Sequence, residues 1–376
     1  MSGKLATIWD APSHTIAKIA ILRSYLFVWF SILQRQFPRR DLWYVDGFAG
    51  PGEYTNYADG SPVAALKAAE SALNEVGGSA NIHCVFIEED KKRFAHLEQK
   101  LRAIPENPRI KRYVYLGTFV EGVARLRSEA INPFVADSPT FAFIDPFGPG
   151  GLSFAAVREL LSGPTCEVLV NLDSDGIGRV FSAGQAANHS KLLNYIYGDD
   201  EWVQEFGGVP THAARVAKAL SLYKKKLMAI PNVQYSFAFE MRKEGNAFDY
   251  HLVFASQHAT GLEKMKEVMK KMDQDGSYCF SDANVAQHML FRDNNDPERY
   301  AKDLFNAFKG KTVSYMGANR FALNETPFIN PKKMLKALER DGTINVICPN
   351  PKRKKGTFSD ESQAGMKIQF RNDMNG

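Results

Sequence analysis

The chain has 376 residues, which is long enough for two domains at the usual ~100 to 200 residues each. An apolar share of 44% and a charged share of 24% describe an ordinary globular protein and exclude a disordered or fibrous chain. The formal net charge of +5 is mild, and no run approaches the ~18 uninterrupted apolar residues of a membrane span.

The N-terminus and the cysteines indicate where the protein is located and whether it has metal sites or disulfides. The first residues lack the basic, apolar and small-residue order of a secretory signal, so we expect a cytoplasmic protein without membrane attachment. The four cysteines lie far apart and form no C-x-x-C pair: Cys84, Cys166, Cys279 and Cys348. We therefore expect neither a metal site nor a disulfide framework.

A helix and a glycine-rich strand end open the chain. Apolar residues recur near helical spacing from Ser13 to Phe37, and a strand then runs into Asp46-Gly47-Phe48-Ala49-Gly50-Pro51-Gly52. A turn with so few side chains, at the carboxyl end of a strand, lets an adenosine-containing cofactor approach the backbone. The G-x-x-G-x-G spacing differs from that of dinucleotide sites, and Asp46 can bind a cationic amino group. This favours S-adenosylmethionine over NAD, with an empty turn as the alternative.

Strands and helices then alternate, which indicates a parallel sheet covered by helices. Strands are predicted at Trp43 to Phe48, His83 to Ile87, Tyr113 to Leu116, Phe141 to Ile144 and Val168 to Leu172. The last two predicted strands, Val233 to Met241 and Phe248 to Ala255, are joined by a turn too short for a parallel crossover. The prediction for residues 1–285 is therefore an α/β fold, a Rossmann-like class I methyltransferase sheet closed by an antiparallel hairpin.

Two further strand ends carry candidate cofactor ligands. Glu88 follows the second strand, where an acid can bind the ribose hydroxyls, although acids are also favoured at the start of a helix by its dipole. Thr118 and Phe119 follow the third strand, where we expect the adenine ring. The predicted cofactor site is completed by four residues of the first turn: Phe48, Ala49, Gly50 and Gly52.

The fourth strand ends in the tetrapeptide Asp145-Pro146-Phe147-Gly148. An exocyclic amine is a poor nucleophile because its lone pair is delocalised, and acceptors that bind its N–H groups localise that pair. Asp145 and the Pro146 carbonyl suit this role, and Phe147 can stack on a base. A strand cap followed by a proline turn is the structural alternative. After the fifth strand, the stretch from Asn171 to Arg179 is expected as a polar loop beside the same cleft.

The alternation of strands and helices ends near a polar segment at Asp293 to Pro297. This change predicts a second domain over residues 286–376. A helix from Pro331 to Arg340, a strand to Cys348, a basic loop and a returning strand resemble the outline of a winged helix. Its basic side chains are the predicted nucleic-acid ligands: Lys332, Lys333, Lys336, Lys352, Arg353, Lys354 and Lys355. A small domain that contacts protein is the alternative.

These motifs together resemble the three-Cys-motif partner family over most of residues 10–275. The resemblance is carried by Tyr44 to Gly52, Gly60-Ser61-Pro62, Ile87-Glu88, Ile144 to Gly148 and Tyr250 to Ser256. It implies a class I methyltransferase-like fold and a radical-SAM-like partner protein that bears the three cysteines. The tetrapeptide at Asp145 is also similar to that of tRNA guanine dimethyltransferases, and it departs from the D-P-P-Y form of DNA amino-methyltransferases.

The sequence therefore favours an enzyme that transfers a methyl group from S-adenosylmethionine to an exocyclic amine of RNA or DNA. One alternative is a catalytically inactive partner subunit that binds nucleic acid and the radical-SAM-like protein. A methyltransferase for small molecules or proteins is a further alternative.

Overall fold

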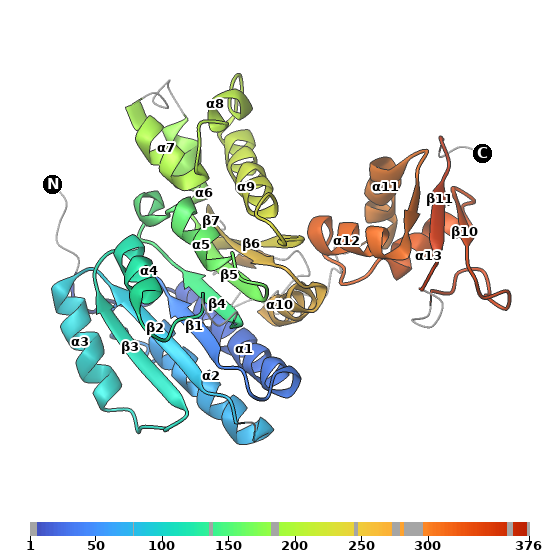
Figure 1. Cartoon of the computed structure of the whole chain (residues 1–376). Coiled ribbons are helices and arrows are strands. Elements are labelled where there is room, and N and C mark those ends of the chain that lie inside the picture. Colours follow the sequence, from blue (N-terminus) through green and yellow to red (C-terminus); the bar gives the residue numbers. More distant parts are fainter. Residues whose placement is uncertain are drawn as a thin grey trace. The chain divides into compact units, whose positions relative to one another are not determined.

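The computed structural model describes residues 6–77, 79–134, 138–181, 188–243, 247–272, 279–281, 296–358 and 364–373. These residues form two compact units (Figure 1). The first unit contains residues 6–272 and 279–281 of the described chain, and the second contains residues 296–358 and 364–373.

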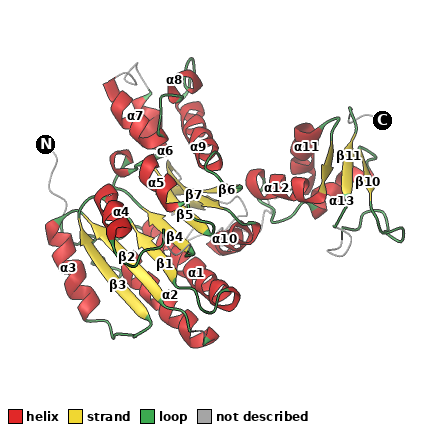
Figure 2. Ribbon diagram, in the orientation of Figure 1, coloured by secondary structure: helices red, strands yellow, loops and turns green. Residues whose placement is uncertain are grey.

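A sheet of eight strands forms the middle of the first unit, in the order β3-β2-β1-β4-β5-β7-β6-β8 over the described ranges. The strands are β1 Leu42–Asp46, β2 Ile82–Glu88, β3 Ile110–Leu116, β4 Thr140–Ile144, β5 Cys166–Leu172, β6 Tyr235–Lys243, β7 Ala247–Ser256 and β8 Cys279–Ser281. Strands β1 to β5 are parallel, and β7 pairs antiparallel with both β5 and β6 (Figure 2). The predicted parallel sheet with its antiparallel hairpin is thereby confirmed.

The strand order creates a crevice at a defined place. β1 lies between β2 and β4, so the chain moves outward in opposite directions from the β1–β4 neighbours. In open α/β sheets ligands bind at such a switch point, outside the carboxyl ends of the strands. The glycine turn after β1 and the tetrapeptide after β4 both lie at this point.

Helices cover both faces of this sheet (Figure 1). Side chains of α4, α5, α7 and α9 join Trp43 and Val45 in one large apolar core, whereas α1 packs against α2 and α10 over the opposite face. Because strand side chains alternate, Tyr44 and Asp46 lie on the α1 face. The helices are α1 Ser13–Gln36, α2 Ser61–Val76, α3 Lys91–Arg102, α4 Phe119–Ser128, the 3-10 turn η1 Pro149–Gly151, α5 Phe154–Leu160, α6 Ser174–Val180, α7 Ser190–Tyr197, α8 Trp202–Glu205, α9 His212–Met228 and α10 Ala259–Met272.

Among the described helices, α1 is long and apolar enough to cross a membrane by length and composition, and 61% of its most apolar window is buried inside the unit. Another helix corrects the sequence analysis. The stretch after Asn171, expected as a loop, forms α6. Asp173 caps this helix by accepting from the Gly176 N–H at 2.7 Å.

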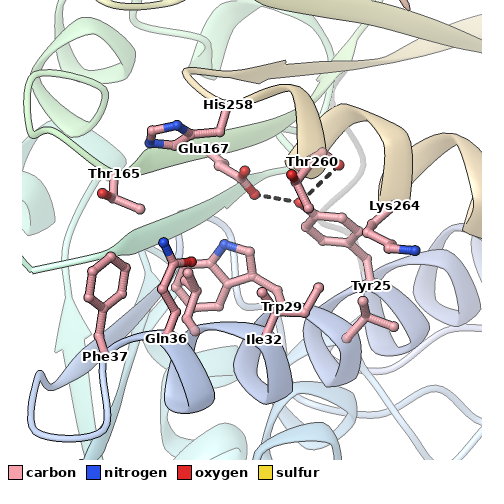
Figure 3. A pocket seen from close by; sticks show the side chains of 13 residues that line it. Tyr25, Trp29, Ile32, Gln36, Phe37, Thr165, Glu167, His258, Thr260 and Lys264 are labelled. Carbon is pink, nitrogen blue, oxygen red and sulfur yellow. Dashed lines mark hydrogen bonds between the residues drawn. The ribbon is translucent and has the colours of Figure 1, made fainter. Parts of the chain in front are cut away.

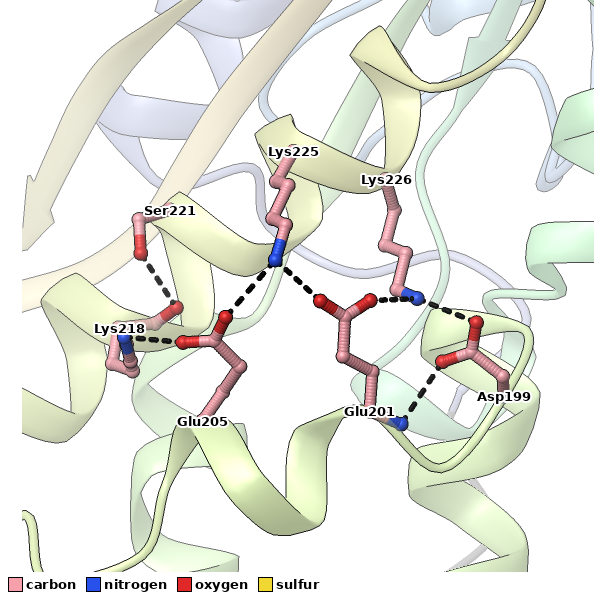
Figure 4. A network of polar contacts seen from close by, with 7 residues as sticks. All are labelled: Asp199, Glu201, Glu205, Lys218, Ser221, Lys225 and Lys226. Carbon is pink, nitrogen blue, oxygen red and sulfur yellow. Dashed lines mark hydrogen bonds and ion pairs between the residues drawn. The ribbon is translucent and has the colours of Figure 1, made fainter.

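Two lysines near the end of α9, Lys225 and Lys226, belong to a network of ion pairs with the acidic residues around α8 (Figure 4). Lys225 and Lys226 of α9 both bind Glu201, and Lys226 also lies 2.5 Å from Asp199. The two ammonium groups lower the pKa of Glu201 to about 2. These pairs tie the start of α8 to α9.

The second unit has its own core and a three-stranded antiparallel sheet in the order β10-β11-β9. Its elements are α11 Pro297–Phe308, β9 Thr312–Ser314, α12 Tyr315–Glu325, α13 Lys332–Arg340, β10 Ile344–Ile347 and β11 Lys367–Phe370. The sequence analysis expected a two-stranded ribbon. It missed β9 and β8, because three residues are too few to show an alternating pattern.

Candidate active site

A pocket of about 210 Å³ lies where the carboxyl ends of β1 and β4 meet. The turn after β1, the tetrapeptide after β4, the first turns of α1 and two tyrosines form its walls. Its lining residues are Trp9, His14, Thr15, Lys18, Phe48, Ala49, Gly50, Pro51, Gly52, Glu53, Tyr54, Gly60, Ser61, Asp145, Pro146, Phe147, Gly148, Asn171 and Tyr250.

The glycine turn is held by its backbone. The Gly47 N–H donates to the Phe143 carbonyl and the Ala49 N–H to the Ile87 carbonyl, each at 2.9 Å. Gly50 and Gly52 have φ values of 63° and 86°, in the left-handed region that favours glycine. Gly50 and Gly52 therefore give the pocket two lining positions without side chains, between those of Phe48, Ala49 and Pro51.

Gly60 closes against this turn. Its N–H donates to the Gly52 carbonyl at 2.8 Å, and a Cβ at Gly60 would lie 2.6 Å from the Gly52 carbonyl carbon. No side chain fits between these two backbone segments, so the Gly60-Ser61-Pro62 motif has a steric reason.

Two predicted cofactor ligands, Asp46 and Glu88, lie behind the pocket wall instead of in it. Asp46 accepts from the Phe48 N–H at 3.3 Å, and Glu88 accepts from the Gly50 N–H at 2.9 Å. Both carboxylates thus hold alternate N–H groups of the same turn. Glu88 also accepts from the Asp90 N–H at 2.8 Å and from Arg93 Nε at 3.0 Å.

Asp46 is completely buried, and the structure describes no cation bound to it. Burial raises its pKa to about 7, although hydrogen bonds from Ser61, Phe48 and Tyr44 oppose this rise. Ser61 also lines the pocket, so Asp46 reaches the pocket through that hydroxyl.

Thr118 and Phe119 are placed outside the pocket lining. Thr118 caps α4, because its hydroxyl accepts from the Glu121 N–H and its own N–H donates to the Glu121 carboxylate. Phe119 is buried with its ring 5.5 Å from that of Phe48, and it leaves no room for a side chain at Gly47. Phe119 supports the turn from behind, which the expectation of an adenine contact did not foresee.

The three predicted acceptor-site residues, Asp145, Pro146 and Phe147, all line the pocket. Lys18 Nζ lies 2.5 Å from Asp145 Oδ2, and Asn171 Nδ2 donates to Asp145 Oδ1 at 2.6 Å. The side chain of Lys18 is only 6% exposed, so this is a buried cation bound to the predicted catalytic carboxylate. The Lys18 ammonium also lies 5.3 Å from the Tyr250 ring centre.

Phe147 is held at the rim of the pocket and remains 55% exposed. Its ring packs edge-on against Trp9, with 5.5 Å between centroids, and the Arg93 guanidinium lies 5.0 Å from its centre. An exposed, supported aromatic face of this kind suits stacking on a planar ring.

Sequence reasoning missed the residues that α1 and the segment before it bring to the pocket, chiefly Trp9, His14 and Lys18. Lys18 carried a signal, because it falls on the apolar face of α1 and is seven residues before the buried Tyr25. A lysine on a buried helix face needs an acidic partner. The sequence did not reveal which acid this is.

The basic residues of the second unit divide into two groups. Lys333, Lys336, Lys352, Lys354 and Lys355 are exposed, and Lys332 is half-buried. Arg353, expected on the exposed basic loop, instead has a buried guanidinium that binds both oxygens of Glu339 at 2.8 and 2.7 Å. Arg353 therefore attaches this loop to α13, because a buried arginine requires a carboxylate partner.

A second pocket in the first unit, of about 200 Å³, lies between α1, the start of β5 and the first turn of α10 (Figure 3). Glu167 in its wall accepts from the Tyr25 hydroxyl at 2.5 Å, and burial raises the pKa of Glu167 to about 7. None of the predicted site residues lines it. In the part of the chain that the structure describes, no group of three or more His, Cys, Asp or Glu side chains could hold a metal ion.

No protein-family model and no curated protein matches this chain. Solved structures with a similar arrangement include an O-methyltransferase from Bacillus cereus in complex with SAH, at 14% identity over 61% of this chain and 80% of that one, with a TM-score of 0.33. Protein LPL1258 from Legionella pneumophila is 14% identical over 70% and 93% of the two chains, with a TM-score of 0.38. These TM-scores are too low to support an argument, so the fold assignment rests on the strand order.

Proposed function

We propose that the chain is an S-adenosylmethionine-dependent methyltransferase that acts on an exocyclic amine of a nucleic acid. One observation carries this proposal: the glycine turn after β1 and the Asp145-Pro146-Phe147 segment after β4 line the same pocket, at the switch point of the sheet. A donor site and an acceptor site must share one cavity for a direct transfer.

The donor end of the pocket suits the cofactor. Gly50, Gly52 and Gly60 form a cradle without side chains, in which an adenosine group can lie against the backbone. Asp46 behind Ser61 is a buried carboxyl group that a cationic amino group would stabilise in its charged form. S-adenosylmethionine, when bound, supplies an electrophilic methyl group.

The acceptor end suits an aromatic amine. Asp145 accepts an N–H of the amine, which localises the nitrogen lone pair, and Phe147 stacks on the base that carries it. Asp145 keeps this capacity beside Lys18 and Asn171, because a carboxylate has about four lone-pair positions and these two donors occupy two of them.

The second unit supports a nucleic-acid substrate. Its element order of helix, strand, two helices and two strands, with β11 between β9 and β10, is that of a winged helix, so we propose this fold for it. Lys333, Lys336 and Lys355 line one hollow of about 580 Å³ in this unit, together with Asp296, Glu298 and Arg340. Arg340 pairs with Glu298, and the three lysines are the cations that suit a phosphate backbone.

A catalytically inactive partner subunit is the second candidate, and it is favoured by the protein partners that the carboxylates of the site already have. Both oxygens of Asp145 already have partners, and Glu88 binds three protein donors. In that case the methyltransferase-like unit serves to bind a radical-SAM-like three-Cys-motif protein, the partner that the family resemblance implies. We propose a cytoplasmic location for either role.

Binding of S-adenosylmethionine, the methyl donor, and transfer of its methyl group distinguish the enzyme from the inactive partner subunit. We expect calorimetry to detect S-adenosylmethionine binding, and a labelled methyl group to pass to bulk tRNA or denatured genomic DNA. Asp145→Ala should abolish transfer and leave donor affinity nearly unchanged. Absence of donor binding would exclude the enzyme. Donor binding without transfer to any nucleic acid would favour the partner subunit.

The second unit needs its own variants. Replacing Lys333, Lys336, Lys354 and Lys355 together by alanine should weaken binding of a single-stranded oligonucleotide while donor binding is retained, because these exposed side chains lie in the second unit. Unchanged oligonucleotide affinity would argue for a small-molecule or protein substrate.

A further inference from the structure

Asp145 and Asn171 are neighbours across two parallel strands. Ile144 of β4 pairs with Val170 of β5, so the next residue on each strand projects from the same face of the sheet. Asn171 Nδ2 donates to Asp145 Oδ1 at 2.6 Å, and this contact orients the amide, since the reverse orientation would bring two oxygens together. The Oδ1 atom of Asn171 therefore points away from Asp145.

That Oδ1 atom is buried, and no described residue donates a hydrogen bond to it. An unsatisfied buried acceptor costs about 1–3 kcal/mol, so such an atom calls for a donor. Lys18, the nearby cation, binds Asp145 Oδ2 and does not donate to Asn171 Oδ1. Asn171 lines the pocket together with Asp145, so a ligand bound beside Asp145 becomes the source of a donor once the Asn171 side chain turns its enclosed Oδ1 atom toward the pocket.

We propose that Asn171 Oδ1, in place of the Pro146 carbonyl expected from the sequence, and Asp145 accept the two N–H groups of the target amine, and that the site consequently stops after one methyl group. The inference rests on the proposed function and specifies its product. Two acceptors on neighbouring strands match a primary amine, which has two N–H donors.

The limit to one methyl group follows from the number of N–H groups that the amine has before and after the transfer. In the transfer, the nitrogen lone pair forms the N–CH₃ bond, and the S–CH₃ bond breaks with its electrons on sulfur, which leaves S-adenosylhomocysteine. One amine proton passes to the Asp145 carboxylate and from there to solvent, so the product amine keeps one N–H. That product leaves one of the two buried acceptors without a partner and places a methyl group against it. A second transfer then begins from a poorly bound substrate. This outcome differs from the dimethylation that the tetrapeptide's resemblance to tRNA guanine dimethyltransferases would suggest.

The test uses the full chain with S-adenosylmethionine and two probes, bulk tRNA and denatured genomic DNA. The nucleic acid is digested after reaction, and its nucleosides are identified by mass spectrometry. We expect an N-monomethylated nucleoside with no N,N-dimethylated form, even after prolonged incubation. We expect Asn171→Ala to lower kcat/KM by about 10- to 100-fold, as for loss of one buried hydrogen bond in the transition state.

Asn107→Ala is the matched control, because Asn107 precedes β3 at the opposite end of the strands and should leave kcat/KM unchanged. Donor affinity, measured by calorimetry, should stay within about two-fold in Asn171→Ala if the variant folds. If this variant fails to fold, the wild-type product distribution still decides the question.

Three results would overturn the inference alone: a mainly N,N-dimethylated product, a nucleoside methylated on oxygen or carbon, or wild-type kcat/KM in a folded Asn171→Ala. Absence of donor binding, or of transfer to both probes, would instead refute the proposed function and this inference with it.

Discussion

Lys18 and Asp145 form a buried ion pair, with Nζ 2.5 Å from Oδ2, that joins α1 to the carboxyl end of β4. The pair places a cation inside the candidate active site and makes the first helix part of it. It also links folding to the site, because neither charge is well solvated when its partner is removed.

Lys18→Met should therefore destabilise the first unit by about 3 kcal/mol, since it leaves the Asp145 carboxylate uncompensated. Urea unfolding followed by tryptophan fluorescence is a selective measurement, because Trp9, Trp29, Trp43 and Trp202 all belong to the first unit. The double variant Lys18→Met with Asp145→Asn should recover most of the loss. If the double variant is no more stable than Lys18→Met, the ion pair is not the cause.

Gly60→Ala should disturb the cofactor turn. The added Cβ would lie 2.6 Å from the Gly52 backbone, so the two segments must separate, at a cost of about 1–3 kcal/mol. We expect S-adenosylmethionine affinity, measured by calorimetry, to fall by at least about ten-fold, which corresponds to ~1.4 kcal/mol. Gly150→Ala is the matched control, because a Cβ there meets no atom within 4 Å. Similar affinities in both variants would contradict the role of the Gly52–Gly60 contact.

Asp46 should make stability fall as pH rises. Its pKa of about 7 in the folded chain exceeds the ordinary 3.8, so between these values the folded state binds a proton that the unfolded state has released. The free energy of unfolding should decrease by up to about 1.4 kcal/mol per pH unit from this group. Asp46→Asn should remove this contribution to the pH dependence of the free energy of unfolding between about pH 4.5 and 6.5. Urea unfolding at pH values about 0.5 units apart measures it.

Glu167 provides the comparison for Asp46, since burial raises its pKa to about 7 as well. Glu167→Gln should reduce the same slope, and the two effects should add because the residues lie at opposite ends of their strands. If the free energy of unfolding depends on pH in the same way in wild type and in Asp46→Asn, Asp46 is already ionised in the folded state.

Arg353 and Lys354 are neighbours in sequence and should behave differently. Arg353→Met removes the buried partner of Glu339, so the second unit should lose stability by about 3 kcal/mol. Lys354→Ala should leave that stability unchanged and should weaken binding of a labelled single-stranded 20-mer (~20 nucleotides), with a salt slope smaller by about 0.7. Circular dichroism and fluorescence anisotropy at several salt concentrations check these outcomes. A loss of binding in folded Arg353→Met equal to that in Lys354→Ala would assign both residues to the nucleic acid.

Much of the fold could be predicted because its signals are local. The parallel strands, their helices and the antiparallel hairpin each appear as a periodic run, and the glycine turn appears as a composition that only a special backbone requires. Four of the predicted donor-site residues, Phe48, Ala49, Gly50 and Gly52, line the pocket, as do all three acceptor-site residues. Strand ends were predictable, so the residues at them were as well.

The sequence by itself determined the sheet, the turn and the position of Asp145, because neighbouring residues encode strand ends and turn chemistry. The tertiary structure decided which groups those residues bind. Glu88 and Asp46 point to the backbone of the turn, Lys18 of α1 reaches Asp145, and Asn171 of β5 lies beside it. Asp46 binds the Phe48 N–H only two residues away, but the other pairings join residues far apart in the chain. Those follow from the packing of α1 on one face of the sheet and from strand register, which no local pattern records.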